Sequence, residues 1–229
     1  MKRRWLQLSG IAIIGIALFI GVFFMMKKWN TPNTPAFQDE FTKQFLNAKA
    51  ETPKGFHLFE SWTFKYTILY PENYFMSDGS YYRKKGLNSD EPDTENVFMR
   101  QEGISPKENG MIKGIQLFLK PDGNNIIEAT MDVMLDKINA PEDTKVEKHK
   151  EDDKTVYYVE NIDEYHAEDE RTATYFYLYG LIADNKSKQA LYFELENACF
   201  DSDTKPCEID FEVEKEMGLK MMKSVEFIR

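Results

Sequence analysis

Apolar residues occupy the first part of the chain without interruption and afterwards recur with the periods of strands and helices. From Trp5 to Met26 no residue is charged, and basic residues flank this run on both sides: Lys2, Arg3, Arg4, Lys27 and Lys28. A helix over these 22 residues is about 33 Å long, close to the thickness of a bilayer's hydrocarbon core, and no small-x-small cleavage triplet follows it. Residues 1–28 therefore predict an uncleaved, single-pass transmembrane signal-anchor with basic flanks.

The charges around this run predict its orientation. Three basic residues precede it and two follow it, which favours a cytoplasmic N-terminus and a C-terminal domain in the bacterial periplasm or at the cell exterior. Trp5 and Trp29 bracket the run, as interfacial tryptophans do. Gly10, Ala17 and Gly21 share one helix face, where small residues let a second membrane helix approach. Glycines are also common in membrane helices without such a partner, so both interpretations stay open.

The pattern changes after the apolar run. Residues 29–36 include Asn-Thr-Pro-Asn-Thr-Pro and predict a short, stiff linker, and residues 37–229 are expected to form one extracytoplasmic α/β domain. Proline at a first helical position predicts a helix from Pro35 to about Lys49, with one aromatic face formed by Phe37, Phe41 and Phe45. We expect this face to pack on the domain core. The alternative is a face that binds a partner or lies on the membrane.

The rest of the chain alternates between strand and helix periodicity. A capping box from Asn125 to Glu128 opens a predicted helix that Pro141 ends, and four-residue spacing predicts a final helix from Ile209 to Met221. The polar stretch from Ser77 to Thr94 predicts a long loop. Strands are expected at residues 62–70, 96–101, 112–119, 145–150, 155–162, 172–182, 189–196 and 225–227.

These elements follow the order helix, strand, loop, strands, helix, four-stranded meander, helix. With the phrases Phe64-Lys-Tyr-Thr-Ile-Leu-Tyr-Pro71 and Met222-Lys-Ser-Val-Glu-Phe227, the order resembles the PsbP-like domains over about residues 56–227. The resemblance implies an α+β protein, with an α/β/α sandwich around a central antiparallel sheet behind the transmembrane helix. It also implies a binding or assembly module rather than an enzyme, and it assigns no functional residue here.

Charge excludes one class of partner. Residues 29–229 carry 24 basic and 39 acidic residues, a net charge of −15. Such a domain is repelled by nucleic acids and by anionic lipid surfaces, so no nucleic-acid partner is expected. Its length suffices for one domain with its own core, and the aromatic content of 14% argues against disorder.

Two cysteines lie eight positions apart across a polar loop. Outside the cytoplasm, Cys199 and Cys207 are expected to form a disulfide, and the short ring would contribute about 2–3 kcal/mol to stability. A two-cysteine metal site is the alternative, but it would need further ligands, and no histidine is close in the sequence.

Candidate metal ligands are sparse. His57 and His149 lie near strand ends, whereas His166 stands in the acidic stretch from Asp163 to Glu170, where carboxylates and imidazole could hold a divalent cation. A second acidic group surrounds the cysteine loop and could bind calcium: Asp201, Asp203, Glu208 and Asp210. Neither spacing matches a known calcium loop, so we interpret both as solvated loops and expect no metal ligand.

Catalytic motifs are also missing from the sequence. It contains no nucleophile elbow, phosphate loop or dinucleotide fingerprint, so we expect no catalytic residue, no cofactor and no enzymatic activity. Tyr175, Tyr177 and Tyr179 share one face of a predicted strand, and Tyr158 and Tyr192 are candidates to adjoin them. Such a platform can bind sugars or peptides, but we expect a helix to cover it.

The sequence therefore favours a non-catalytic accessory or assembly subunit. The bilayer and a membrane-protein complex are its expected partners, because a short linker restricts the domain to partners near the membrane. The alternative is an extracytoplasmic domain that binds a small ligand or a cation through its acidic loops.

Overall fold

The computed structural model describes residues 32–63, 65–76, 79, 81–84, 94–101, 111–120, 122–166, 172–200 and 209–228. Within these residues the strands form two antiparallel sheets, one of eight strands and one of four. The predicted anchor over residues 1–28, with Trp5, Gly10, Ala17 and Gly21, lies outside the described part of the chain, as does Trp29. In the ranges given above, no helix is long and apolar enough to cross a membrane.

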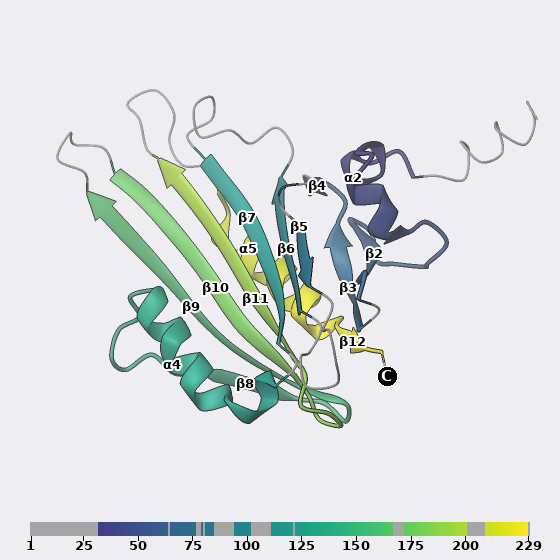
Figure 1. Cartoon of the computed structure of the whole chain (residues 1–229). Helices are drawn as coiled ribbons and strands as arrows, with labels where there is room; N and C mark the ends of the chain where they lie inside the picture. The colour runs from purple at the N-terminus through teal and green to yellow at the C-terminus, as the bar shows by residue number, and fades with distance from the viewer. Residues whose placement is uncertain are drawn as a thin grey trace, which may run out of the picture.

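The larger sheet is long and curved (Figure 1). Its neighbouring strands run in the order β4, β6, β7, β11, β10, β9 and β8, and β5 pairs with β6 as well. The bounds are β4 Tyr74–Phe75, β5 Tyr81–Lys84, β6 Thr94–Gln101, β7 Met111–Lys120, β8 Glu147–Lys150, β9 Lys154–His166, β10 Thr172–Asp184 and β11 Ala190–Phe200.

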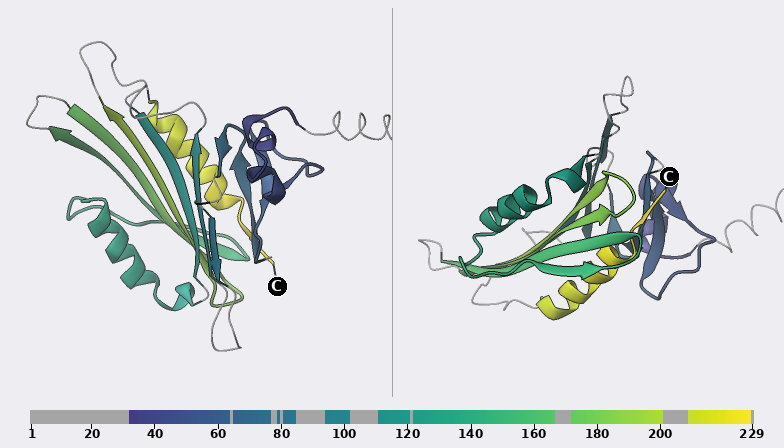
Figure 2. Two further views of the ribbon diagram at one scale, coloured as in Figure 1. Left: turned by 45° about the horizontal axis from the view of Figure 1, so that its top comes forward. Right: turned by 90° about the horizontal axis from the view of Figure 1, so that it is seen from below.

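The register of this sheet sorts its side chains onto two faces. Tyr179 of β10 lies opposite Val159 of β9 and Glu194 of β11, so these three side chains share one face. Leu178 and Leu195 pair on the other face. The two faces are covered by different helices, which Figure 2 shows on opposite sides of the sheet.

Helix α4, Ile127–Lys137, packs on the face that carries Tyr179. Met131 and Met134 point to the sheet and are buried against Val159 and Leu181. In Figure 1 the helix lies along the lower part of the sheet, and its contacts are mainly with β9 and β10. We call this side of the sheet the α4 face.

Helix α5, Phe211–Lys223, packs on the opposite face and begins at Asp210. The Asp210 carboxylate accepts hydrogen bonds from the backbone of the first helical turn, as an N-cap does. Gly180 and Gly218 allow the close approach of helix and sheet, because a Cβ at Gly180 would overlap Met222 and one at Gly218 would lie 2.6 Å from Leu178.

The four-stranded sheet lies beside α5 and completes the cover of the second face (Figures 1 and 2). Its order is β1, β2, β3, β12, with bounds Leu46–Asn47, Phe56–Glu60, Tyr66–Pro71 and Glu226–Phe227. The predicted α/β/α sandwich is therefore wrong. The segments around Phe56, Tyr66 and Glu226 pair with one another in a second sheet, so one outer layer contains a sheet as well as a helix.

Three local predictions also need correction. The helix expected from Pro35 to Lys49 is two short ones, α2 Pro35–Gln38 and η1 Thr42–Phe45. Asp39 between them has an extended backbone, and its carboxylate accepts the Thr42 N–H at 2.7 Å, which starts a new turn.

The strand expected from Trp62 begins only at Tyr66, because the Ser61 N–H donates to the Tyr66 carbonyl at 3.0 Å and closes a turn. The capping box at Asn125 does not form, since Ile126 is the N-cap of α4 and makes no side-chain cap hydrogen bond.

Candidate functional site

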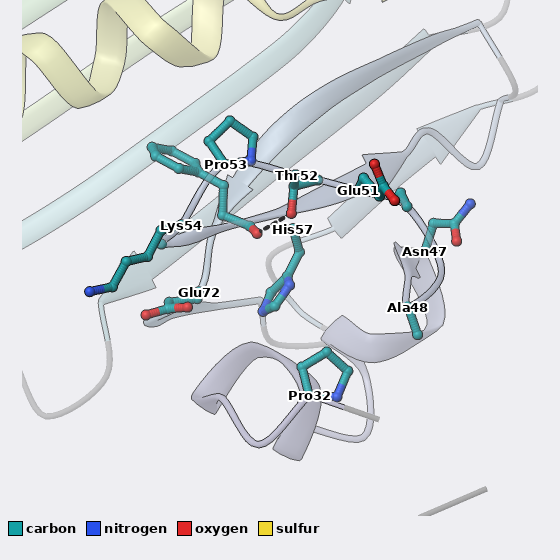
Figure 3. Close-up of a pocket in the computed structure, with 12 residues that line it drawn as sticks. Pro32, Asn47, Ala48, Glu51, Thr52, Pro53, Lys54, His57 and Glu72 are labelled. Atoms are coloured by element: carbon teal, nitrogen blue, oxygen red, sulfur yellow. Dashed lines mark hydrogen bonds between the residues drawn. The ribbon is translucent and has the colours of Figure 1, made fainter. Parts of the chain in front are cut away.

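A pocket of about 410 Å³ lies where the β1–β2 connection meets β2 (Figure 3). His57 of β2 forms part of its wall, and Lys54, Glu51 and Glu72 lie around it. The remaining lining residues are Pro32, Asn47, Ala48, Ala50, Thr52, Pro53, Gly55 and Phe56. Gly55 has φ = 87°, so a residue without Cβ suits the turn into β2.

The His57 imidazole is held by the protein itself. Its Nε2 lies 2.7 Å from Thr34 Oγ1, and the Phe37 ring packs edge-on against it with ring centroids 4.6 Å apart. Burial lowers the pKa of His57, and the nearby Glu72 carboxylate opposes that shift. Because the ring is hydrogen-bonded and packed, His57 fixes the start of α2 against β2.

The charged groups around this pocket are Glu51, Lys54 and Glu72. Among the described residues, no side chain forms an ion pair with Glu51, Lys54 or Glu72. Thr52 donates its hydroxyl proton to the Phe56 carbonyl at 2.6 Å and orders the loop. The pocket can thus offer both signs of charge to a small polar ligand.

A second polar cluster lies between the two sheets and is closed. Glu95 of β6 is fully buried and accepts hydrogen bonds from the Ser61 hydroxyl, the Thr63 hydroxyl at 3.1 Å and the Tyr81 hydroxyl at 2.5 Å. The Trp62 N–H donates at 3.2 Å. Burial and the Glu95 carboxylate raise the pKa of Tyr81. Both carboxylate oxygens are satisfied, so this cluster joins β6 and β5 to the β2–β3 turn as a structural contact.

The α4 face carries a row of aromatic and acidic side chains beyond the helix. We call Tyr165, Tyr175 and Tyr177, with Asp163 and Glu196, the tyrosine surface. Asp163 lies opposite Tyr175, and Glu196 lies opposite Tyr177, so the register places all of them on the α4 face. Tyr165 of β9 is 61% exposed. Tyr179, which follows Tyr177 on the same face of β10, is fully buried under α4.

The tyrosines of this surface are partly open to solvent and ordered by one another. The Tyr175 and Tyr177 rings are stacked, with centroids 6.0 Å apart and an interplanar angle of 4°. Both are only partly buried. Burial, then the Glu196 carboxylate and the neighbouring Tyr175 and Asp163, raise the pKa of Tyr177, so its hydroxyl stays protonated in a negative environment.

The sequence prediction for these tyrosines was right in part. Tyr192 shares their face and lies opposite Leu181, but Tyr158 pairs with Gly180 and points to the α5 side. The expected helix covers Tyr179 and leaves Tyr175 partly exposed. The alternation of side chains along a strand predicted that these tyrosines share one face of the sheet. How much of that face is covered depends on the position of α4.

The other candidate residues are scattered. His149 is an exposed residue whose Nε2 lies 3.3 Å from Glu151 Oε1, and Asp210 is the N-cap of α5. The His166 side chain lies outside the described residues, as do the acidic positions 168–170, 201, 203 and 208. Where side chains are described, no group of three or more His, Cys, Asp and Glu could hold a metal ion.

Cys199 is buried near the end of β11 and is disulfide-bonded. Cys207, its expected partner, lies outside the described residues. The pairing of these two cysteines therefore stays a prediction.

Comparison with known families gives one match. The family model YvcA_Mog1p, described as Putative lipoprotein YvcA, matches residues 32–226. The chain belongs to this family. The match spans both sheets and both long helices, so the family is defined by the whole described domain. No curated protein matches the chain significantly.

The family description corrects the predicted mode of membrane attachment. The matched family is described as a putative lipoprotein, and a lipoprotein is held at a membrane by a covalently attached lipid. The predictions of a single-pass transmembrane protein and of a signal-anchor are therefore wrong.

Proposed function

We propose that this protein is a non-catalytic accessory domain that works at a membrane surface and binds a partner protein through its tyrosine surface. One observation carries the proposal. The same sheet face is sealed by α4 at Tyr179 and is partly exposed at Tyr175 and Tyr177, although the side chains are of the same kind. Aromatic residues beside a polar rim are typical of protein interfaces.

Two further points support the proposal. The matched family is described as a putative lipoprotein, and lipoproteins function at membrane surfaces. The sequence phrases that resemble PsbP-like domains favour a binding or assembly module, although the family match itself does not point to PsbP. The polar residues that could act in catalysis are instead hydrogen-bonded within the domain. Glu95 is fully hydrogen-bonded, and His57 is held by Thr34.

Site-specific photo-crosslinking in the native cells tests the proposal. A benzophenone amino acid replaces Tyr165 on the tyrosine surface or, as the matched control, Val133 on the outer side of α4, which is 65% exposed. We expect one crosslinked product of defined mass at position 165 and none at 133, and mass spectrometry then identifies the partner. Equal crosslinking at both positions, or none at position 165, would contradict the proposal.

The pocket next to His57 supports a second candidate function, the binding of a small polar ligand. The unpaired charges of Glu51, Lys54 and Glu72 favour a zwitterionic compound over an apolar one. A ligand that binds only the folded state raises the melting temperature. A panel of free amino acids should raise it for the wild type and not for Lys54→Met, and no shift with any of them would end this candidate.

A further inference from the structure

The chain already places cations of its own on the α4 face. Lys137 of α4 has its Nζ 4.8 Å from the centroid of the Tyr179 ring, 2.8 Å from Glu194 Oε2 and 3.7 Å from Glu196 Oε1. A cation over an aromatic face is attracted by the ring's quadrupole, and a neighbouring carboxylate strengthens the attraction. Ring, cation and carboxylate thus form one compact unit at the end of α4.

The arrangement of cation and ring occurs a second time, lower on the same face. Lys120 of β7 has its Nζ 4.6 Å from the centroid of the Tyr192 ring and 5.7 Å from that of Phe118. Lysines of the domain itself therefore lie over the Tyr179 and Tyr192 rings of this face.

The next two tyrosines along β10 also have carboxylates beside them, but among the described residues no lysine lies over their rings. Tyr175 and Tyr177 form a stacked pair with nearly parallel rings, and Asp163 lies across from Tyr175 on β9. Glu196 lies across from Tyr177 on β11; its Oε1 accepts the Tyr179 hydroxyl and lies 3.7 Å from Lys137 Nζ, so only its other oxygen is left for a partner. Phe200 packs edge-on against Tyr175 at 6.2 Å. In the described part of the chain, no lysine or arginine lies over either tyrosine ring.

We propose that Tyr175 and Tyr177, with Asp163 and Glu196, bind an arginine or lysine side chain of the partner protein. The inference rests on the proposed function, because it names the partner's chemistry at the same tyrosine surface. The two nearly parallel ring faces suit the planar guanidinium of arginine better than the compact ammonium of lysine. The net charge of −15 over residues 29–229 attracts a basic partner and guides its approach.

Peptide binding to the full-length chain tests this inference. The probe is a fluorescein-labelled peptide of three Gly-Ser-Arg repeats, and the reference peptides replace each Arg by Lys or by Gln. Fluorescence anisotropy at physiological salt should rank the affinities in the order Arg, Lys, Gln. A neutral oligosaccharide that binds the same surface while the Arg peptide does not would overturn the inference.

Matched variants distinguish specific binding at the tyrosine surface from nonspecific attraction by the domain's negative charge. Tyr177→Leu keeps an apolar side chain without the aromatic quadrupole, and Asp163→Asn removes one carboxylate. Each should weaken binding of the Arg peptide about three- to ten-fold. The controls Tyr82→Leu, at a tyrosine 59% exposed on β5, and Asp132→Asn, on the outside of α4, should change it less than about two-fold. Circular dichroism confirms that the variants fold.

The outcomes distinguish the inference from the proposed function. If position 165 crosslinks to a partner but Tyr177→Leu and Asp163→Asn bind the Arg peptide as the wild type does, the cation site is wrong and the accessory role stands. If Asp132→Asn weakens binding as much as Asp163→Asn, the attraction is nonspecific and the inference is also overturned. If position 165 gives no crosslink, the proposed function fails.

Discussion

The two halves of the α4 face carry similar side chains but differ in what covers them. Near Lys137 the Tyr179 ring is buried and already pairs with a lysine, whereas near Asp163 the Tyr175 and Tyr177 rings are partly exposed. The 13-residue β10 spans about 43 Å, and the 11-residue α4 spans only about 16 Å. A helix of this length cannot cover the whole strand, so it leaves Tyr175 and Tyr177 partly exposed. Tyr179, which it does cover, shows how a tyrosine of this face pairs with a lysine.

The opposite face of the same sheet is covered far more completely. There α5 and the four-stranded sheet share one core with the strands, and Leu178, Leu195 and Met222 are fully buried. This difference indicates that the α5 face holds the domain together and that the open half of the α4 face is available for binding.

Truncation of side chains on the two faces should show the largest contrast. Leu178→Ala removes a buried side chain that packs beneath Gly218, and we expect it to lower the free energy of unfolding by about 3 kcal/mol. Tyr175→Ala should cost less than about 1 kcal/mol, because that ring is partly exposed. Urea unfolding measures both. Similar losses would show that the open half contributes to the core.

The second-largest effect on stability is expected at the buried Glu95 cluster. Glu95→Gln keeps the shape but replaces one acceptor oxygen by a donor group, which leaves a hydroxyl of Ser61, Thr63 or Tyr81 without its acceptor. We expect a loss of about 2 kcal/mol in urea unfolding. Glu60→Gln, at an exposed carboxylate that accepts from Asn47, is the control and should change stability by less than about 0.5 kcal/mol. A near-neutral Glu95→Gln would show that the cluster does not join the sheets.

Removal of the Lys137 cation should change peptide binding more than stability. Lys137→Met loses a solvent-screened ion pair and a cation–π contact, so we expect a stability loss of only about 0.5–1 kcal/mol. Binding of the Arg peptide should become tighter, since Glu196 of the tyrosine surface then lacks the lysine that lies 3.7 Å from it. Weaker binding would mean that Lys137 does not compete with the partner's cation.

The smallest effect concerns pH. Burial lowers the pKa of His57 in the folded state, so the unfolded chain binds this proton first as the pH falls. Stability from this group is full above the unfolded value of about 6.5 and is lost as the pH falls through the lower folded pKa. The difference in melting temperature between pH 7.5 and pH 5.5 should therefore shrink in His57→Asn and remain in the exposed His149→Asn. An unchanged difference in His57→Asn would rule out this contribution.

Periodicity predicted much of the fold. Strand β10 and helix α5 follow from alternation around Leu178 and from the four-residue spacing of Val213, Met217 and Met221. It could not show that Phe56–Glu60 and Tyr66–Pro71 form a separate sheet, because pairing between distant strands depends on register and not on local pattern. Nor could it show that Asp39 ends α2, since its extended backbone is set by the contacts of the following turn.

The candidate site was predictable only in part. The sequence placed Tyr175 and Tyr177 on one face, but the exposure of that face depends on the length and position of α4. Glu95 gave no signal, because a single glutamate in a strand looks like any exposed carboxylate until its neighbours are known. The lysines above Tyr179 and Tyr192 could not be found by spacing, since they come from α4 and β7.

Tyrosine footprinting tests the central claim most directly. The full-length chain is nitrated briefly, once in native membranes and once after purification, and modification is quantified by mass spectrometry. Tyr165 and Tyr82 are comparably exposed, at 61% and 59%, and lie on different surfaces. If the open half of the α4 face binds a partner, Tyr165 is protected in the membranes while Tyr82 reacts equally in both samples. Equal modification of Tyr165 in the two samples would contradict the account.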